Sequence, residues 1–272
     1  MTNKQSVGYH SIIAAVTPNT SHQPAAIRAA NVAGKLHSEV TLAHVISAAP
    51  DTQALTDVIK ELIDSHSEIT GIKSIQGNSL EIITLVDEMS GDLIVLDDLS
   101  FTTLAPSLME SRQRACDHGD CDALLIHADN HSAESPPADY KHIVVAADLN
   151  EQGLMTIYKA VRMARRYQAR LTLLNVVAQF DSEKEDDKIK AKQLRLRGLE
   201  AFTAVIEGIE VEKEVRVTAQ TVDQAVCEFS TEHDADLIVM GSHKFKGLCV
   251  LLGEKAQQVI KASSCDVLIV HE

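Results

Sequence analysis

A glycine-containing segment near the C-terminal end of the chain could bind phosphate. The segment LIVMGSHKFKGLCVLLGEKAQQVI, residues 237–260, starts as an apolar strand that ends at Met240 and continues with Gly241 and Ser242. It then reaches Gly253, directly before a predicted helix. Backbone N–H groups of such a loop and the positive end of the following helix bind nucleotide phosphates in many proteins. The alternative is that the glycines only form turns.

A second group with possible chemistry follows another apolar strand. The run HIVVAAD ends in Ala147 and Asp148. A carboxylate in this position can accept hydrogen bonds from a sugar or a base. The alternative is that Asp148 caps the helix that follows. The residue types alone leave both interpretations open.

Two internal repeats supply the elements that position these groups. YHSIIAAVTPN at Tyr9 matches YKHIVVAADLN at Tyr140, and DLIVLDD at Asp92 matches DLIVMGS at Asp236, in each case without gaps. Over 36 aligned positions from Asp92 onward, 13 are identical. The offset grows from 131 to 144 residues, so the second repeat has an insertion, which we place in the charged segment after Val177. A duplicated unit is therefore predicted.

The repeats divide the chain into domains. We predict a first repeat over residues 1–129, a linker over 130–139 and a second repeat over 140–272. The polar stretch ADNHSAESPPAD, with Pro136 and Pro137, is typical of a linker.

Each repeat alternates strands with helices. Continuous apolar runs such as HIVVAAD indicate strands buried on both faces, and Leu154, Ile157, Val161 and Ala164 recur at helical spacing. The apolar stripe of the next predicted helix is formed by Leu199, Phe202 and Ile206. This alternation predicts an α/β fold of two tandem doubly wound five-stranded parallel sheets with strand order 3-2-1-4-5. In such a sheet, ligands bind beyond the carboxyl ends of strands 1 and 4, where the winding reverses.

Three motifs resemble the universal stress protein family. They are IVVAADLNE, LLNVV and the ending LIVMGSHKFKGLCVLLGEKAQQVIKASSCDVLIV, and related segments occur in the same order in the first repeat. The resemblance implies the α/β unit predicted above. It also implies that a member either binds ATP or another adenine nucleotide or acts in stress survival without one.

The resemblance also implies where a nucleotide would bind. ATP-binding members carry a glycine after strand 4, then two residues, a second glycine, nine residues, and a glycine followed by Ser or Thr. Gly241 fits the first position, Lys244 replaces the second glycine, Gly253 arrives one residue early, and Glu254 replaces the hydroxyl residue. The implied cofactor-binding residues are Ala147, Asp148, Val176, Met240, Gly241, Ser242, Gly253, Glu254 and Lys255.

The first repeat departs further from that pattern. Thr17 stands where the second repeat has Asp148, and Asp97 and Asp98 stand where it has Gly241 and Ser242. Two carboxylates at this point repel phosphate. We therefore predict a first repeat without a nucleotide site.

Composition excludes several classes of function. The net charge of -14 disfavours binding to nucleic acid or to an anionic membrane. No signal peptide or membrane span is visible, and five cysteines without a CxxC pair predict reduced thiols in a cytoplasmic protein. Cys116, His118 and Cys121 lack a second pair of ligands, so no metal site is expected.

The sequence thus predicts a non-catalytic cytoplasmic stress-response protein that acts by protein contacts, with at most weak adenine-nucleotide binding in repeat two and no required cofactor. One alternative is an ATP- or AMP-binding protein with slow ATP hydrolysis, and another is a pseudo-enzyme subunit of the wider adenine-nucleotide α-hydrolase group. The fifth strands, residues 121–127 and 265–271, are short apolar runs without Lys or Pro. We expect them to pair within the chain as a pseudo-dimer, with a further homodimer possible and the protein partners unknown.

Overall fold

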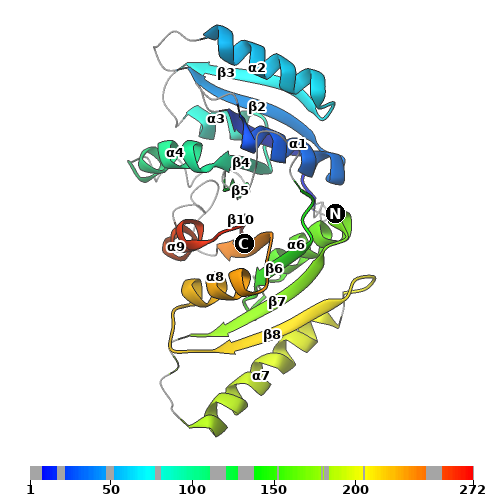
Figure 1. Ribbon diagram of the computed structural model, residues 1–272, viewed down its shortest axis with the longest axis vertical. Coiled ribbons are helices and arrows are strands. Elements are labelled where there is room, and N and C mark those ends of the chain that lie inside the picture. The colour runs from blue at the N-terminus through cyan, green and yellow to red at the C-terminus, as the bar shows by residue number, and fades with distance from the viewer. Residues whose placement is uncertain are drawn as a thin grey trace, which may run out of the picture. The chain divides into compact units, whose positions relative to one another are not determined.

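The computed structural model describes residues 8–16, 22–46, 52–76, 81–110, 121–127, 138–151, 153–178, 180, 184–204, 206–242 and 253–271. These residues form two compact units, and the described chain passes from the first to the second between Asp139 and Tyr140. Figure 1 shows the helices and strands of both units.

The first unit is a parallel five-stranded sheet with helices between its strands. The strands lie in the order β3-β2-β1-β4-β5, which is the predicted 3-2-1-4-5. In chain order the elements are β1 (Ser11–Val16), α1 (Pro24–Leu36), β2 (Glu39–Ile46), α2 (Thr52–Ser65), β3 (Ile69–Gln76), α3 (Glu81–Glu88), β4 (Leu93–Asp97), α4 (Asp98–Glu110) and β5 (Asp122–Ile126).

The second unit repeats this topology. Its strands lie in the order β8-β7-β6-β9-β10, again parallel and again equivalent to 3-2-1-4-5. The elements are β6 (His142–Ala146), α6 (Gly153–Tyr167), β7 (Arg170–Val177), α7 (Glu185–Thr203), β8 (Val211–Val217), α8 (Val222–Glu232), β9 (Leu237–Ser242), α9 (Glu254–Ala262) and β10 (Asp266–His271). The fold class predicted for each repeat is confirmed.

Apolar strands and one-sided helices produce the core. The four residues Leu237 to Met240 are buried, as a strand covered on both faces requires. In α6 the predicted apolar positions Ile157, Val161 and Ala164 are buried. Right-handed crossovers place α6 and α7 on one face of the second sheet and α8 and α9 on the other, where α8 packs against α9.

The duplication extends to polar contacts at the amino ends of the strands. The hydroxyl of Tyr9 donates to Asp122, and the hydroxyl of Tyr140 donates to Asp266 at 2.7 Å. Burial, and then the nearby Asp122 carboxylate, raise the pKa of Tyr9 well above its ordinary value. Each bond joins the segment before the first strand of its unit to the start of the fifth strand. The hydrogen bond thus connects the first and fifth strands of the unit, which the fourth strand separates in the sheet.

A second duplicated contact lies beside the first. Asp92 accepts hydrogen bonds from the backbone N–H groups of His10 and Ser11, at 2.7 and 3.1 Å. In the second unit, Asp236 accepts from the corresponding N–H groups of Lys141 and His142, at 2.7 and 2.8 Å. The aspartates that begin the matched DLIV motifs therefore have a structural role.

The segment before the second unit is bound to α1 in its described part. Arg28 donates to the carbonyl of Ala138 at 2.8 Å, and Asp139 accepts from Asn31 at 3.3 Å and from Lys35 at 2.5 Å. The side-chain hydrogen bond from Lys35 lowers the pKa of Asp139. The last residues of the predicted linker thus pack on the first unit, and residues 128–137 lie outside the described part.

Two predicted boundaries were wrong. Ile206, expected on the apolar stripe of a helix with Leu199 and Phe202, lies beyond the end of α7 at Thr203. Gly241 and Ser242, expected in a loop, are the last two residues of β9. They pair with Val270 and His271 of β10, and this pairing extends the strand past the point where the small residues begin.

Part of the insertion predicted in the second repeat lies in a helix. The helix α7 has 19 residues, whereas the equivalent helix α2 of the first unit has 14.

Candidate functional site

The winding of the second sheet reverses between β6 and β9, so the candidate crevice lies beyond the carboxyl ends of these strands. Ala146 pairs with Met240 at this point, and Ala147 and Asp148 extend from β6. The residues predicted from the two strands therefore come together. Loop residues 243–252, which include His243, Lys244, Lys246 and Gly247, lie outside the described residues.

The β6 side of the crevice is held rigidly by β7. The N–H group of Ala147 donates to the carbonyl of Leu174 at 2.8 Å, and Asn175 Nδ2 donates to the carbonyl of Ala147 at 2.8 Å. Ala147 and Asn175 are buried, and Val176 is half-buried beside them. The buried Oδ1 of Asn175 has no hydrogen-bond partner among the described residues. These contacts fix the backbone from which Asp148 leaves the strand.

Asp148 is exposed at this end of the sheet, and another side chain between β6 and α6 bonds to the start of the helix. Asn150 Oδ1 accepts the N–H group of Gly153 at 2.8 Å, at the start of α6. A Cβ added at Gly153 would lie 2.3 Å from the carbonyl oxygen of Asp148, so the turn requires glycine there. Asn150 thus bonds to the first residue of α6, and the Asp148 carboxylate is exposed.

On the β9 side of the crevice, the sequence predicted that backbone groups after Met240 would bind a ligand. Met240 and Ser242 are buried and Gly241 is half-buried. Because Gly241 and Ser242 pair as strand residues with β10, one side of their backbone is already engaged in the sheet. This differs from the free small-residue loop that the sequence predicted.

The helix on this side begins with a carboxylate. Gly253 is the residue before α9 and makes no side-chain cap, and Glu254 lies in the first turn with Lys255 beside it. Both charged side chains are exposed. A carboxylate at a helix N-terminus is favourable for the helix, because it interacts with the positive end of the helix dipole. Glu254 therefore puts a negative charge at the helix end whose positive potential would otherwise favour a phosphate.

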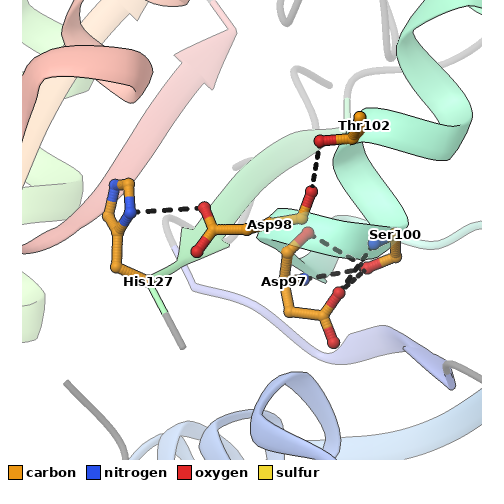
Figure 2. A network of polar contacts seen from close by, with 5 residues as sticks. All are labelled: Asp97, Asp98, Ser100, Thr102 and His127. Carbon is orange, nitrogen blue, oxygen red and sulfur yellow. Dashed lines mark hydrogen bonds and ion pairs between the residues drawn. The ribbon is translucent and has the colours of Figure 1, made fainter. Parts of the chain in front are cut away.

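The corresponding place in the first unit is filled by a helix. Asp97 ends β4 and Asp98 begins α4, so no loop separates the strand from the helix. Asp97 Oδ1 accepts from the N–H and the hydroxyl of Ser100, at 2.7 and 2.5 Å, and Ser100 Oγ accepts from the N–H of Asp97 at 2.9 Å (Figure 2). The N–H group of Ser100, in the first turn of α4, is thus bonded to the buried carboxyl group of Asp97.

The second aspartate binds the end of β5. His127 Nδ1 lies 3.2 Å from Asp98 Oδ1, and Thr102 donates to the carbonyl of Asp98 at 2.6 Å. Figure 2 shows both contacts at the start of α4. Ser100 bonds to Asp97 rather than to His127, so these residues do not form a nucleophile-and-base arrangement. The first unit therefore has two carboxyl groups where the second has Gly241 and Ser242, and Thr17 lies outside the described residues.

Sequence reasoning missed Asn175 and its counterpart. The offset between the repeats aligns Asn175 with His44, so each unit has a buried polar residue near the carboxyl end of its second strand. Burial lowers the pKa of His44. A polar residue inside an otherwise apolar strand, present twice, was the signal that could have revealed this position.

Other kinds of site find no support in the part of the chain that the structure describes. No group of three or more His, Cys, Asp or Glu side chains there is placed to hold a metal ion. Cys121, Cys227 and Cys265 are buried free thiols, and burial raises the pKa of Cys227 to about 11. Within the same residues, no helix is both long and apolar enough to cross a membrane.

Comparison of the sequence identifies relatives. The Universal stress protein family profile matches residues 139–271. Universal stress protein A homolog 1 of Coxiella burnetii is 28% identical over 138 residues, which cover 48% of this chain and 96% of the relative. Universal stress protein MJ0531 of Methanocaldococcus jannaschii is 30% identical over 143 residues, covering 49% of this chain and 83% of the relative. Each relative therefore matches about half of this chain.

Comparison of the fold finds solved structures that match nearly the whole chain. A protein described as functionally unknown, PA1789 from Pseudomonas aeruginosa, has a TM-score of 0.70 at 20% identity and covers 97% of this chain and 93% of its own. A universal stress protein from Archaeoglobus fulgidus has a TM-score of 0.67 at 14% identity, covering 98% of each chain. These likenesses concern the fold. Together with the sequence relatives, they lead to one conclusion: the chain belongs to the universal stress protein family.

Proposed function

We propose that this protein is a non-catalytic, tandem-repeat stress-response protein that acts through protein contacts and binds adenine nucleotide at most weakly, in the crevice of the second unit. One observation carries the proposal: each crevice has a carboxyl group on its strand-4 side. Asp97 and Asp98 occupy it in the first unit, and Glu254 begins α9 in the second. Two like charges about 4 Å apart cost about 1 kcal/mol in water and several times more in a partly dry cleft.

A second candidate function is nucleotide binding with slow hydrolysis. The favouring observation is the β6 side of the second crevice, where Asn175 donates to the carbonyl of Ala147 and the neighbouring Asp148 is exposed. The two candidates therefore differ in whether the repulsion between Glu254 and a phosphate is larger than the favourable contacts that the β6 side would make with a sugar or a base.

Native mass spectrometry of the purified protein tests the proposal. We expect the mass of the chain alone, without a co-purified adenine nucleotide, because the carboxylate of Glu254 disfavours a phosphate at α9. Glu254→Ser with Lys244→Gly restores the hydroxyl residue and the second glycine, though not the spacing of Gly253, and is expected to increase nucleotide occupancy. A stoichiometric adenine nucleotide on the wild-type protein would support the second candidate instead.

We further propose that the two units pair through their fifth strands. In its own unit, β5 follows β4 and β10 follows β9 at the end of the strand order. An apolar end strand without Lys or Pro favours pairing with another strand. Because a single chain contains both, one such strand has an effective concentration of about a millimolar near the other.

A charge in this proposed seam is expected to separate the units. Leu124→Lys in β5 or Leu268→Lys in β10 places an ammonium group on an apolar strand, so the radius of gyration from solution scattering should increase. Leu99→Lys is the matched control, because Leu99 is 54% exposed and should tolerate the same change. An unchanged radius in both strand variants, with folding retained, would rule out pairing through these strands.

A further inference from the structure

A buried histidine joins three strands of the second unit to the end of a helix. His142, at the start of β6, is 4% exposed. Its Nδ1 lies 2.8 Å from Arg170 Nη2 and 3.0 Å from the carbonyl oxygen of His233, which follows α8. Its Nε2 lies 2.9 Å from the hydroxyl of Thr172, which donates to Glu212 at 3.0 Å. The contacts thus form a chain from Arg170 in β7 to His142 in β6, from His142 to Thr172 in β7, and from Thr172 to Glu212 in β8.

The donors and acceptors of this chain agree with one tautomer. A guanidinium group only donates, so Nδ1 must accept from Arg170. The proton of the neutral ring is then on Nε2 and is donated to Thr172, whose own hydroxyl proton goes to Glu212. Arg170 also donates to the carbonyl of His233 at 3.3 Å. In this state Nδ1 and the His233 carbonyl oxygen are two acceptors that share one donor.

We propose that His142 is a proton-operated switch: when the ring takes up a second proton from solvent, Nδ1 changes from accepting Arg170 to donating to the carbonyl of His233, and Arg170 is released. The exchange requires little movement, because the carbonyl oxygen already lies at hydrogen-bond distance from Nδ1. Arg170 must leave, because two cationic donors would otherwise face each other. It keeps the Glu212 carboxylate, 3.8 Å away.

The surrounding charges determine the direction of the response. Burial lowers the pKa of His142, and Arg170 acts in the same direction, whereas the His233 carbonyl, Glu212 and Asp236 oppose it. Below the ordinary pKa of 6.5, the folded unit therefore binds fewer protons than the unfolded chain. The stability from this group is complete above that pH and is lost as the pH falls. The switch destabilises the second unit in acid.

The first unit provides an internal comparison. The repeat offset aligns His142 with Ser11 and Arg170 with Glu39, so the first unit has neither the imidazole nor the guanidinium. Ser11 instead bonds to the carbonyl of Met89 at 3.4 Å. Acid sensitivity that depends on an imidazole and a guanidinium in contact is therefore expected only in the second unit, although burial also lowers the pKa of His44 in the first unit.

Hydrogen exchange on the full chain tests the switch. Between about pH 7.5 and about pH 5, protection of the β6, β7 and α8 amides should fall several-fold relative to the amides of β4 and β5, two strands without a histidine, after correction for intrinsic rates. His142→Ser, the residue of the first unit, should remove this difference, and Arg170→Gln should reduce it. Retention of the same difference in folded His142→Ser would overturn the proposal.

Nitrogen NMR of the imidazole gives a second readout that does not depend on stability. We expect the Nε2–H tautomer at neutral pH and a change of environment at Nδ1 as the ring is protonated. A neutral ring that carries its proton on Nδ1 would contradict the assignment, because Nδ1 could not then accept from Arg170.

Discussion

Tyr140→Phe is expected to lower the free energy of unfolding of the second unit by about 1.5–3 kcal/mol, the range for a hydrogen bond to a charged group. The hydroxyl of Tyr140 donates to Asp266, which is 2% exposed, at 2.7 Å. Phenylalanine keeps the ring, whose centroid lies 5.0 Å from that of Tyr167, so the change removes the hydroxyl and little else. Loss of a donor to a buried acceptor costs more than the bond contributes, because water does not replace it.

The measurement must separate the two units, because a two-unit chain need not unfold in one step. Hydrogen exchange of the β6 and β10 amides reports on the second unit. Asp266→Asn combined with Tyr140→Phe forms a double-mutant cycle, and Tyr9→Phe, the equivalent change in the first unit, should affect β1 and β5 instead. If the effects of Tyr140→Phe and Asp266→Asn on the free energy of unfolding were additive, the hydrogen bond between these two side chains would contribute no interaction energy.

Gly153→Ala is expected to destabilise the second unit by about 1–3 kcal/mol, the cost of forcing an extra carbon into a packed site. Alanine is normally the better helix former, so intrinsic propensity predicts the opposite sign. The new Cβ would lie 2.3 Å from the carbonyl oxygen of Asp148, and a backbone atom cannot rotate away as a side chain can. The turn that carries Asp148 must therefore move.

Gly208→Ala is the matched control for this change. Gly208 has a φ of 73° and nothing within 4 Å of an added Cβ, so alanine there costs only its left-handed conformation, about 1–2 kcal/mol. The two variants differ in where the damage appears: Gly153→Ala should reduce protection at the start of α6, and Gly208→Ala only near β8. If Gly153→Ala raised the stability of the unit, the close approach of Asp148 would be wrong.

The strand order could be predicted from sequence because strands that alternate with helices pair in parallel through right-handed crossovers, and two signals located those strands. Continuous apolar runs marked the central strands, and the ungapped offsets placed each run at the same point of both repeats. The helix boundaries were less secure, since apolar spacing continues past a helix end. Ile206 fits the stripe of α7, but the helix ends at Thr203.

The candidate site could be predicted only in part. Asp148 and Glu254 follow from chain position relative to a strand or a helix, which local sequence determines. The inclusion of Gly241 and Ser242 in β9 depends on pairing with β10. The buried hydrogen bond between Asn175 and Ala147 joins residues that are 28 positions apart in the sequence. The His142 contacts connect β6, β7, β8 and α8. Such contacts come from tertiary packing, which residue spacing does not encode.

Calorimetric titration of the full chain with ATP and magnesium tests the central claim most directly. Because Glu254 puts a carboxylate at the start of α9, and Asp97 and Asp98 stand where the second unit has Gly241 and Ser242, we expect a dissociation constant no tighter than about 10 µM. Glu254→Ser with Lys244→Gly should bind ATP more tightly than the wild type. A sub-micromolar constant for the wild-type protein would contradict the account, because the crevice of the second unit would then be a working nucleotide site.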